Sequence, residues 1–194
     1  MRALFTIVAL AGLIACAPAE PTASSELDAV EAELLATYFP TPENVVQRML
    51  DAVDLQPGEI HFDLGSGDGR FVLTAAGDFG SDSTGFEIDE TLVRISRNRI
   101  RRAGLGDHAR ILSQDLMTAD FAAADVISAF LTPEGYVKLE PLLRQDVRDD
   151  TRLVAYKFPI PGWEPIETFT IDDKDPEIPT HEVFVYRGAP ASSE

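Results

Sequence analysis

Apolar and polar residues follow two alternating patterns along this chain. Short runs rich in apolar residues, typical of buried strands, occur at 60–64, 84–89, 109–112, 125–130 and 152–158. Between them, apolar residues three and four positions apart predict amphipathic helices over 42–53, 70–79, 90–103 and 134–147. Segments 163–171 and 181–187 predict a closing antiparallel pair, joined by the acidic loop 172–177. Strands that alternate with helices favour an α/β fold, with a mostly parallel sheet and helices on both faces.

Several residues mark the expected helix ends. Ser25 is expected to cap a helix over 26–37, and Thr41 a second helix that begins with Pro42. The second helix carries a stripe of core residues, namely Val46, Met49, Leu50 and Val53. Pro141 lies inside the helix predicted over 134–147, where we expect a kink.

The most informative stretch is 60–70, where a buried strand runs into a glycine-rich turn and then into a helix. The turn has glycine at every second position, Gly65, Gly67 and Gly69. Glycine permits positive φ and lets a ligand approach the main chain, while the next helix directs its free N–H groups at the same crevice. Arg70 departs from the dinucleotide fingerprint, and Asp63 and Asp68 suit a cationic ligand better than a pyrophosphate. A tight turn that binds nothing is the alternative.

Two further carboxylates follow the next predicted strands. Glu87 ends the second strand, one strand–helix–strand unit after Gly69, and a carboxylate there can accept both hydroxyls of a ribose. Asp115 follows the third strand and can accept from an adenine amino group, while a neighbouring backbone N–H meets the ring nitrogen. Both carboxylates are therefore expected at the edge of the sheet that holds the glycine turn.

These segments together resemble class I S-adenosylmethionine-dependent methyltransferases. The resemblance rests on residues 63–70, 85–89 and 114–115. More closely, segments 39–42, 131–134 and 158–163 are similar to the small stand-alone protein-lysine methyltransferases of archaea and mitochondria. The resemblance covers about residues 38–187.

The resemblance implies a Rossmann-like domain over 25–194, with a seven-stranded sheet and a cofactor core at about 57–130. It implies S-adenosylmethionine as the cofactor and a protein lysine amine as the methyl acceptor. The cofactor-binding residues that it implies are Asp63, Gly65, Ser66, Gly67, Gly69, Glu87, Asp115 and Leu116.

The acceptor side of the site is less defined by the sequence. Candidates for a substrate channel are Phe130, Glu134, Tyr136, Tyr156 and Trp163, with core packing as the alternative role of each. The Asp/Asn-Pro-Pro-aromatic segment of many amino-group methyltransferases is replaced by residues 130–134, which disfavours nucleic-acid bases and glutamine as acceptors. No catalytic residue can be assigned. A small-molecule methyltransferase and a non-catalytic envelope lipoprotein that binds an adenosine ligand are the alternatives.

Charge narrows the range of partners. The net charge of −17 disfavours nucleic acid, whose phosphates would be repelled, and would attract a basic protein substrate. A solvated acidic surface is the alternative. The three histidines lie far apart in sequence and the chain has one cysteine, so no spacing predicts a metal site. The arginines between 90 and 103 predict a solvated helix face, with a basic site for an acidic partner as the alternative. The sequence does not indicate an oligomeric state.

The first residues resemble an export signal. The apolar run 3–15 is too short to span a membrane, and Cys16 stands where a bacterial lipoprotein is lipidated. Residues 17–24 then form a tether. Residues 1–16 therefore predict a lipid-anchored, periplasm-facing protein of the cell envelope, or a cytoplasmic one if the leader is not processed.

Overall fold

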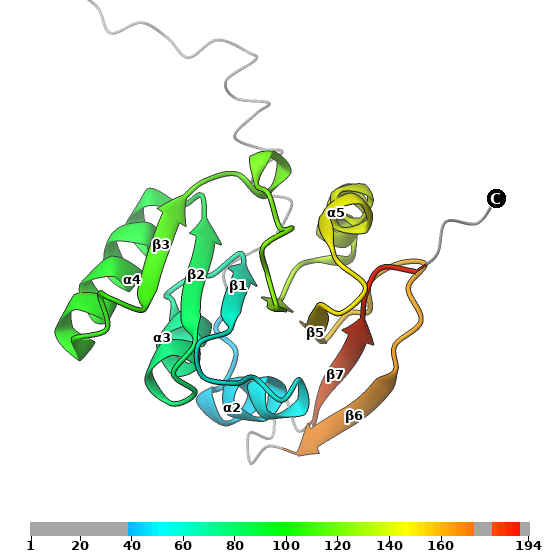
Figure 1. Cartoon of the computed structure of the whole chain (residues 1–194), viewed down its shortest axis with the longest axis horizontal. Helices are drawn as coiled ribbons and strands as arrows, with labels where there is room; N and C mark the ends of the chain where they lie inside the picture. The colour runs from blue at the N-terminus through cyan, green and yellow to red at the C-terminus, as the bar shows by residue number, and fades with distance from the viewer. Residues whose placement is uncertain (1–38, 173–179, 191–194) are drawn as a thin grey trace, which may run out of the picture.

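The computed structural model describes residues 39–172 and 180–190 (Figure 1). Their strands form one seven-stranded sheet in the order β3-β2-β1-β4-β5-β7-β6. The strands are β1 (Ile60–Leu64), β2 (Asp82–Glu87), β3 (Ala109–Ser113), β4 (Val126–Ala129), β5 (Arg152–Tyr156), β6 (Glu167–Asp172) and β7 (Thr180–Arg187). β1 to β5 pair in parallel, whereas β7 is antiparallel to both β5 and β6. The predicted α/β fold with a closing antiparallel pair is confirmed.

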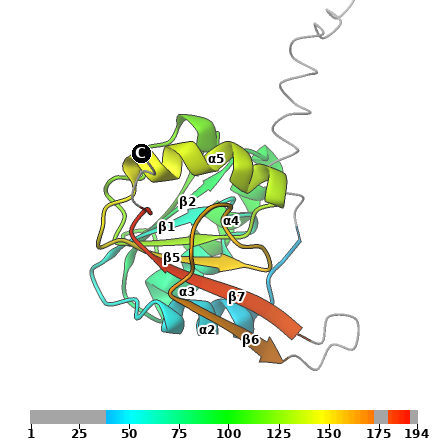
Figure 2. The same ribbon diagram turned by 90° about the vertical axis from the view of Figure 1, so that its right-hand side faces the viewer.

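Helices cover both faces of this sheet. In the described residues they are α2 (Glu43–Ala52), α3 (Arg70–Gly77), α4 (Glu90–Ala103), α5 (Pro133–Asp146) and the short 3-10 helix η1 (Leu116–Thr118). Figure 2 shows α5 on one face of the sheet and α2 and α3 on the other. The helix expected over 26–37 lies outside the described residues.

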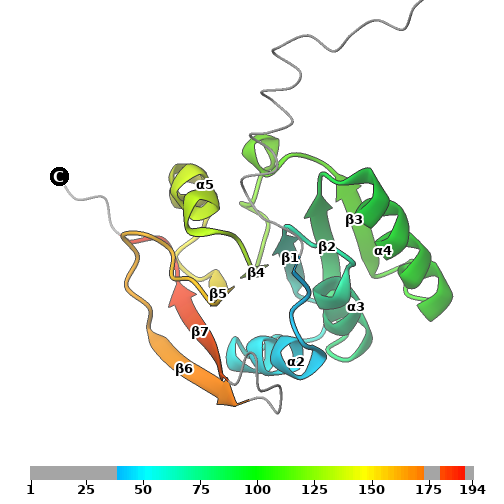
Figure 3. The same ribbon diagram turned by 180° about the vertical axis from the view of Figure 1, so that it is seen from behind.

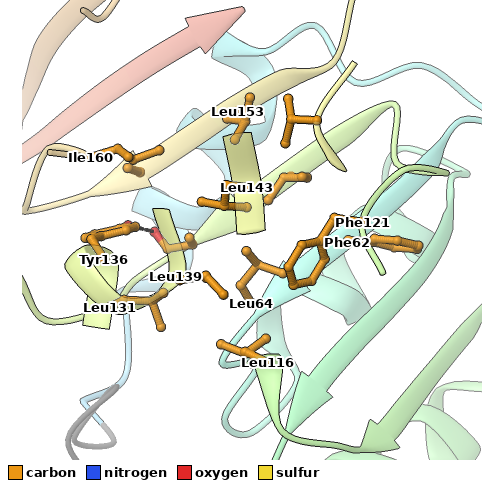
Figure 4. Packing of buried hydrophobic residues seen from close by; sticks show 14 of the residues in the cluster. Phe62, Leu64, Leu116, Phe121, Leu131, Tyr136, Leu139, Leu143, Leu153 and Ile160 are labelled. Atoms are coloured by element: carbon orange, nitrogen blue, oxygen red, sulfur yellow. Dashed lines mark hydrogen bonds between the residues drawn. The ribbon is translucent and has the colours of Figure 1, made fainter. Parts of the chain in front are cut away.

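The core has a separate layer on each face because successive strand residues point to opposite sides. In β4, Val126 packs with the helix α2 layer, and the next residue, Ile127, packs with the helix α5 layer. The α5 layer is built around buried side chains that include Phe62, Leu64, Phe121, Tyr136, Leu139, Leu143 and Leu153 (Figure 4). The predicted stripe of α2 is buried against the opposite face. The two apolar layers cover both faces of the sheet. The loops at the carboxyl ends of the strands lie outside these layers.

Several boundaries are shifted from the predicted ones, and two of these shifts have a visible cause. Helix α2 begins at Glu43 with Pro42 at its N-cap position, so buried Thr41 lies one residue too early to cap it, and no side chain caps the helix. Strand β6 begins at Glu167, so Trp163 lies in a turn before the strand, where its indole packs against Tyr186. In both places tertiary packing overrides the local pattern.

Candidate active site

The carboxyl ends of β1, β2 and β3 point to one edge of the sheet, where η1 also lies (Figures 1 and 3). The glycine turn 65–69 follows β1, Glu87 ends β2, and Asp115 follows β3. Open parallel sheets bind ligands at this edge, outside the carboxyl ends of the strands. The structure therefore brings together the three predicted cofactor segments, which lie about 20 to 30 residues apart in sequence.

The glycine turn is bonded to the end of the neighbouring strand. The backbone N–H groups of Gly65 and Ser66 donate to the Phe86 carbonyl at 3.1 and 2.8 Å. The N–H of Gly67 donates to Glu87 Oε2 at 2.8 Å. All three glycines of the turn adopt positive φ, as predicted. These bonds hold the turn in one position before a ligand arrives.

Gly85 in β2 is required by close packing rather than by its backbone angles. A Cβ at this position would lie 2.6 Å from both Cβ and Oγ of Ser66. Any larger residue would therefore push the turn away from β2. The fit explains why glycine precedes the Phe86–Glu87 pair at the end of this strand.

The Glu87 carboxylate is fixed by three backbone donors. Its Oε1 accepts from the N–H groups of Ile88 and Asp89 at 2.8 and 2.9 Å, and its Oε2 accepts from Gly67. A carboxylate oxygen has two lone pairs, so Glu87 keeps acceptor capacity for ribose hydroxyls. Its orientation is set by the protein before any ligand binds.

Asp115 caps the start of the short helix η1. Its Oδ1 accepts from the Met117 N–H at 2.9 Å, and Leu116 between them is buried. Two apolar side chains that the sequence analysis missed, Ile88 and Met117, are 46% and 44% exposed beside the two acidic positions. The sequence pattern that could have indicated them is an apolar residue close after each carboxylate. Ile88 directly follows Glu87, and Met117 lies two positions after Asp115. Exposed apolar surface at this edge suits the faces of a flat ring.

Asp63 is held from below by a buried chain of polar side chains across three strands. The Ser128 hydroxyl donates to Asp63 Oδ1 at 2.6 Å. His61 Nε2 lies 2.9 Å from Ser128 Oγ, and its Nδ1 lies 2.8 Å from Ser83 Oγ. Because the hydroxyl proton of Ser128 points to Asp63, its oxygen accepts from His61 Nε2–H, and Nδ1 then accepts from Ser83. Burial lowers the pKa of His61 to about 3, so this ring is neutral.

The second oxygen of the Asp63 carboxyl has no hydrogen-bond partner in the part of the chain that the structure describes. Asp63 Oδ2 and Ser66 Oγ are buried polar atoms with no hydrogen bond among the described residues. Burial raises the pKa of Asp63 to about 7, the Ser128 bond opposes this rise, and the charges of Glu87 and Asp68 add to it. A buried acceptor without a partner is costly, so a cationic or N–H-bearing ligand group would be stabilised there.

Asp68 does not add the free negative charge that the sequence suggested. Its carboxylate pairs with Arg70 at 2.9 Å and with Arg99 of α4. Burial alone would raise the pKa of Asp68, but the hydrogen bonds and charge of Arg70, together with the charge of Arg99, lower it below its usual value. Arg97 donates to the Ile111 carbonyl, so α4 is not only a solvated basic face. Arg99 fastens α4 to the glycine turn and Arg97 fastens it to β3, and the sequence did not indicate either contact.

Three of the five channel candidates lie in the core. Tyr136 is fully buried and its hydroxyl donates to the Ala129 carbonyl at 3.1 Å. The hydroxyl of buried Tyr156 lies 2.5 Å from His181 Nδ1, and Trp163 donates from Nε1 to Glu140 at 2.9 Å. These three residues therefore have the packing role that was their alternative. Phe130 is half-buried and Glu134 is exposed in the first turn of α5, so only these two candidates present surface.

The site residues fit S-adenosylmethionine. The unpaired Asp63 Oδ2 and Ser66 Oγ suit the ammonium of its methionine part, and the oriented Glu87 carboxylate suits its ribose. Asp115, with the exposed Ile88 and Met117, suits an adenine ring. Among the described residues, no group of three His, Cys, Asp or Glu could hold a metal ion.

Comparisons with known proteins agree with this fit. The model of the ANTKMT methyltransferase domain matches residues 63–167, more than half of the chain. A protein-lysine N-methyltransferase of Saccharolobus islandicus is 35% identical over 150 residues, which are 77% of this chain and 91% of that protein. A lysine N-methyltransferase of Xenopus laevis, named for a subunit of ATP synthase, is 34% identical over 137 residues, 71% of this chain. The chain spans only 60% of the length of that second relative.

A solved structure extends the likeness to the whole fold. The crystal structure of an RNA methyltransferase from Salinibacter ruber, in complex with S-adenosyl-L-homocysteine, has a TM-score of 0.71 and 33% identity. The alignment covers 80% of this chain and 97% of that one. The matched domain, the two relatives and the bound product of this structure all point to one chemistry. The chain belongs to the ANTKMT methyltransferase domain family and is an S-adenosylmethionine-dependent methyltransferase.

Proposed function

We propose that this protein transfers the methyl group of S-adenosylmethionine to a lysine amine of a protein substrate. The proposal rests mainly on the similarity to the Saccharolobus islandicus protein-lysine N-methyltransferase. The alignment covers 91% of the length of that relative. The Xenopus laevis relative also acts on a protein lysine, as its name states. The S-adenosylmethionine site described above supplies the donor half of that reaction.

The reaction requires alignment more than acid–base strength. S-adenosylmethionine supplies a methyl carbon on a positively charged sulfur. The acceptor lysine first loses a proton to solvent or a nearby carboxylate, and the N–C bond then forms as the S–C bond breaks. The chain contributes the fixed positions of Asp63, Glu87 and Asp115, which hold the donor in one orientation.

The charge of the protein favours a basic acceptor. With a net charge of −17, long-range attraction favours a lysine-rich partner, and phosphates would be repelled. The Salinibacter ruber relative supports RNA as a second candidate acceptor. We favour the protein acceptor because both charge and the two lysine methyltransferase relatives support it.

A label-transfer experiment separates the candidates. The full chain is incubated with methyl-tritiated S-adenosylmethionine and a cell lysate, and samples are then treated with protease or ribonuclease. The proposal expects label that protease releases and that hydrolysis recovers as methylated lysine. Label released by ribonuclease, or found only in small molecules, would contradict it, and no transfer at all would favour a non-catalytic binder.

We also propose that Cys16 carries a lipid that anchors the protein to the cell envelope. The support is the apolar run before the single cysteine of the chain, and both lie outside the described residues. No described helix is long and apolar enough to cross a membrane. A periplasmic location would separate the protein from cytoplasmic S-adenosylmethionine, so it would also require transport of that cofactor.

The anchor is tested by palmitate labelling and fractionation of the wild type and Cys16→Ser. Label and membrane association that both disappear in Cys16→Ser would support the anchor. Unlabelled wild-type protein in the cytoplasmic fraction would contradict it and would place the protein with its cofactor.

A further inference from the structure

An ammonium group lies over two aromatic rings just beyond the end of β5. Lys157 Nζ is 5.9 Å from the ring centroid of Phe39 and 5.7 Å from that of Phe158. Both distances fall within the range of cation–π attraction. Phe39 is 50% exposed and is the only aromatic residue among the exposed large apolar side chains of residues 39–172 and 180–190. An exposed ring that faces a cation is suited to binding one.

The backbone at this place is strained. Lys157 has a φ of +68°, and Asp54 is the only other described residue besides glycine with a positive φ. The conformation is held by two bonds, from Lys157 N–H to the Glu182 carbonyl and from Phe158 N–H to the Tyr156 carbonyl, both at 2.8 Å. Strain that the surroundings maintain is typical of sites with a function.

The ring pair is connected to the cofactor site from two directions. Phe39 lies two residues before Thr41, whose carbonyl accepts from the Arg70 guanidinium. Arg70 also pairs with Asp68 of the glycine turn. On the other side, the half-buried channel candidate Phe130 follows β4 and packs edge-on against Tyr156, at a centroid distance of 4.6 Å. Because β5 runs parallel to β4 and β4 to β1, Phe158 lies just beyond the carboxyl end of β5, at the same edge of the sheet as the glycine turn.

We propose that Phe39 and Phe158 bind the ammonium of the acceptor lysine, and that Lys157 occupies this place until the acceptor displaces it. The proposal rests on the proposed protein-lysine substrate. The Lys157 side chain ends in the same group as the acceptor, so rings that attract one attract the other. A methylated ammonium is held by the same rings, because aromatic faces also bind quaternary ammonium groups.

Lys157 thus acts as an internal competitor. If it fills the ring pair for more than half of the time, the apparent affinity for an external ammonium is reduced more than twofold. Replacement of Lys157 by an uncharged side chain of similar length should raise the apparent affinity for an external ammonium by the same factor. Removal of one ring should weaken binding about two- to fivefold, the usual worth of an exposed cation–π contact.

The probe is N-acetyl-Nε-trimethyl-lysine, titrated into the full chain and followed by NMR. Lys157→Met is expected to bind it at least twofold more tightly, and the matched control Lys138→Met, an exposed lysine on α5, as the wild type does. Phe39→Leu and Phe158→Leu should each weaken binding, whereas Phe39→Tyr and Phe158→Tyr, which keep a ring, should not.

The leucine variants overturn the proposal if they are folded, by their NMR spectra, and still bind the probe like the wild type. Tighter binding in Lys138→Met equal to that in Lys157→Met would also overturn it, because charge alone would then explain the gain. Failure of the proposed lysine methylation would give a different result. The label-transfer experiment would then leave no label in protein, while binding of the probe in the NMR titration would still depend on Phe39 and Phe158.

Discussion

Replacement of Asp63 by Asn measures how much the ionisation of this buried carboxyl lowers the free energy of unfolding. Asn has the same shape, and its Oδ1 still accepts from the Ser128 hydroxyl, but it cannot ionise. In the protein without ligand, burial raises the pKa of Asp63 to about 7, against 3.8 for an ordinary aspartate. Between these two values the folded protein holds a proton that the unfolded chain has lost. The free energy of unfolding of the wild type therefore falls as pH rises between these two pKa values. Above pH 7 this contribution no longer changes.

The size of this effect follows from the two pKa values. Relative to an aspartate with an unshifted pKa, Asp63 lowers the free energy of unfolding by about 2 kcal/mol at pH 5 and by about 4–5 kcal/mol at pH 8. In the Asp63→Asn variant the free energy of unfolding is not lowered in this way, because the amide does not ionise. The free energy of unfolding of the variant minus that of the wild type should therefore rise by about 3 kcal/mol from pH 5 to pH 8. The titration of His61 occurs in both proteins and cancels in the difference.

Urea unfolding of both proteins at pH 5 and pH 8, without S-adenosylmethionine, measures this difference. The difference between pH values does not depend on the fixed cost of placing an amide in the site. A variant-minus-wild-type difference that is equal at both pH values would refute the raised pKa. The same variant should bind S-adenosylmethionine more weakly at pH 8, because the unpaired Oδ2 becomes an N–H donor.

Three other substitutions test separate parts of the site. Glu87→Ala should weaken S-adenosylmethionine binding by about 1–3 kcal/mol in calorimetry, because the ribose hydroxyls and the Gly67 N–H lose their acceptor; the exposed control Asp107→Ala should not, and equal affinities would contradict the assignment. Gly85→Ala should lower the free energy of unfolding by about 1–3 kcal/mol, because the new Cβ meets Ser66. Gly106→Ala, where a Cβ meets nothing within 4 Å, is its control, and equal stability of the two variants would rule out the clash. Tyr136→Phe should cost about 1–3 kcal/mol by leaving the buried Ala129 carbonyl without its donor, and unfolding midpoints equal to the wild type would contradict the role of that bond.

Sequence reasoning succeeded where the determinants are local. Helix α4 matches its predicted bounds because both ends carry a local signal. Asp89 caps its first turn by accepting from Thr91 and Leu92, and Gly104 ends it at a φ of +71°. The glycine turn and Glu87 were predicted for the same reason, since the turn needs positive φ and the carboxylate ends a recognisable strand.

Long-range contacts explain what the sequence did not indicate. Ser128 meets Asp63 only because the register of β1 and β4 places them opposite each other, and His61 faces Ser83 through the register of β1 and β2. Polar residues inside apolar strands carry no local sign of such partners. The pairing of Arg99 with Asp68 is likewise fixed by how α4 packs, not by the helix pattern.

The aromatic channel candidates show the same limit. Tyr136 and Trp163 have side chains that are equally suited to a substrate channel and to a core, and no pattern in the sequence separates the two roles. Their burial depends on Ala129 and Glu140, which the fold brings to the hydroxyl and the indole nitrogen. Conversely, Phe39 stands in a short proline-rich segment, and only the structure shows that it faces Lys157.

The most direct test of the account is calorimetry of the full chain with S-adenosyl-L-homocysteine, the product of methyl transfer. We expect saturable binding of one ligand per chain, which weakens about fivefold or more in Glu87→Ala, a loss of about 1 kcal/mol or more. The absence of saturable heat with the folded wild-type protein would contradict the assignment of the crevice at the carboxyl ends of β1, β2 and β3 as the cofactor site.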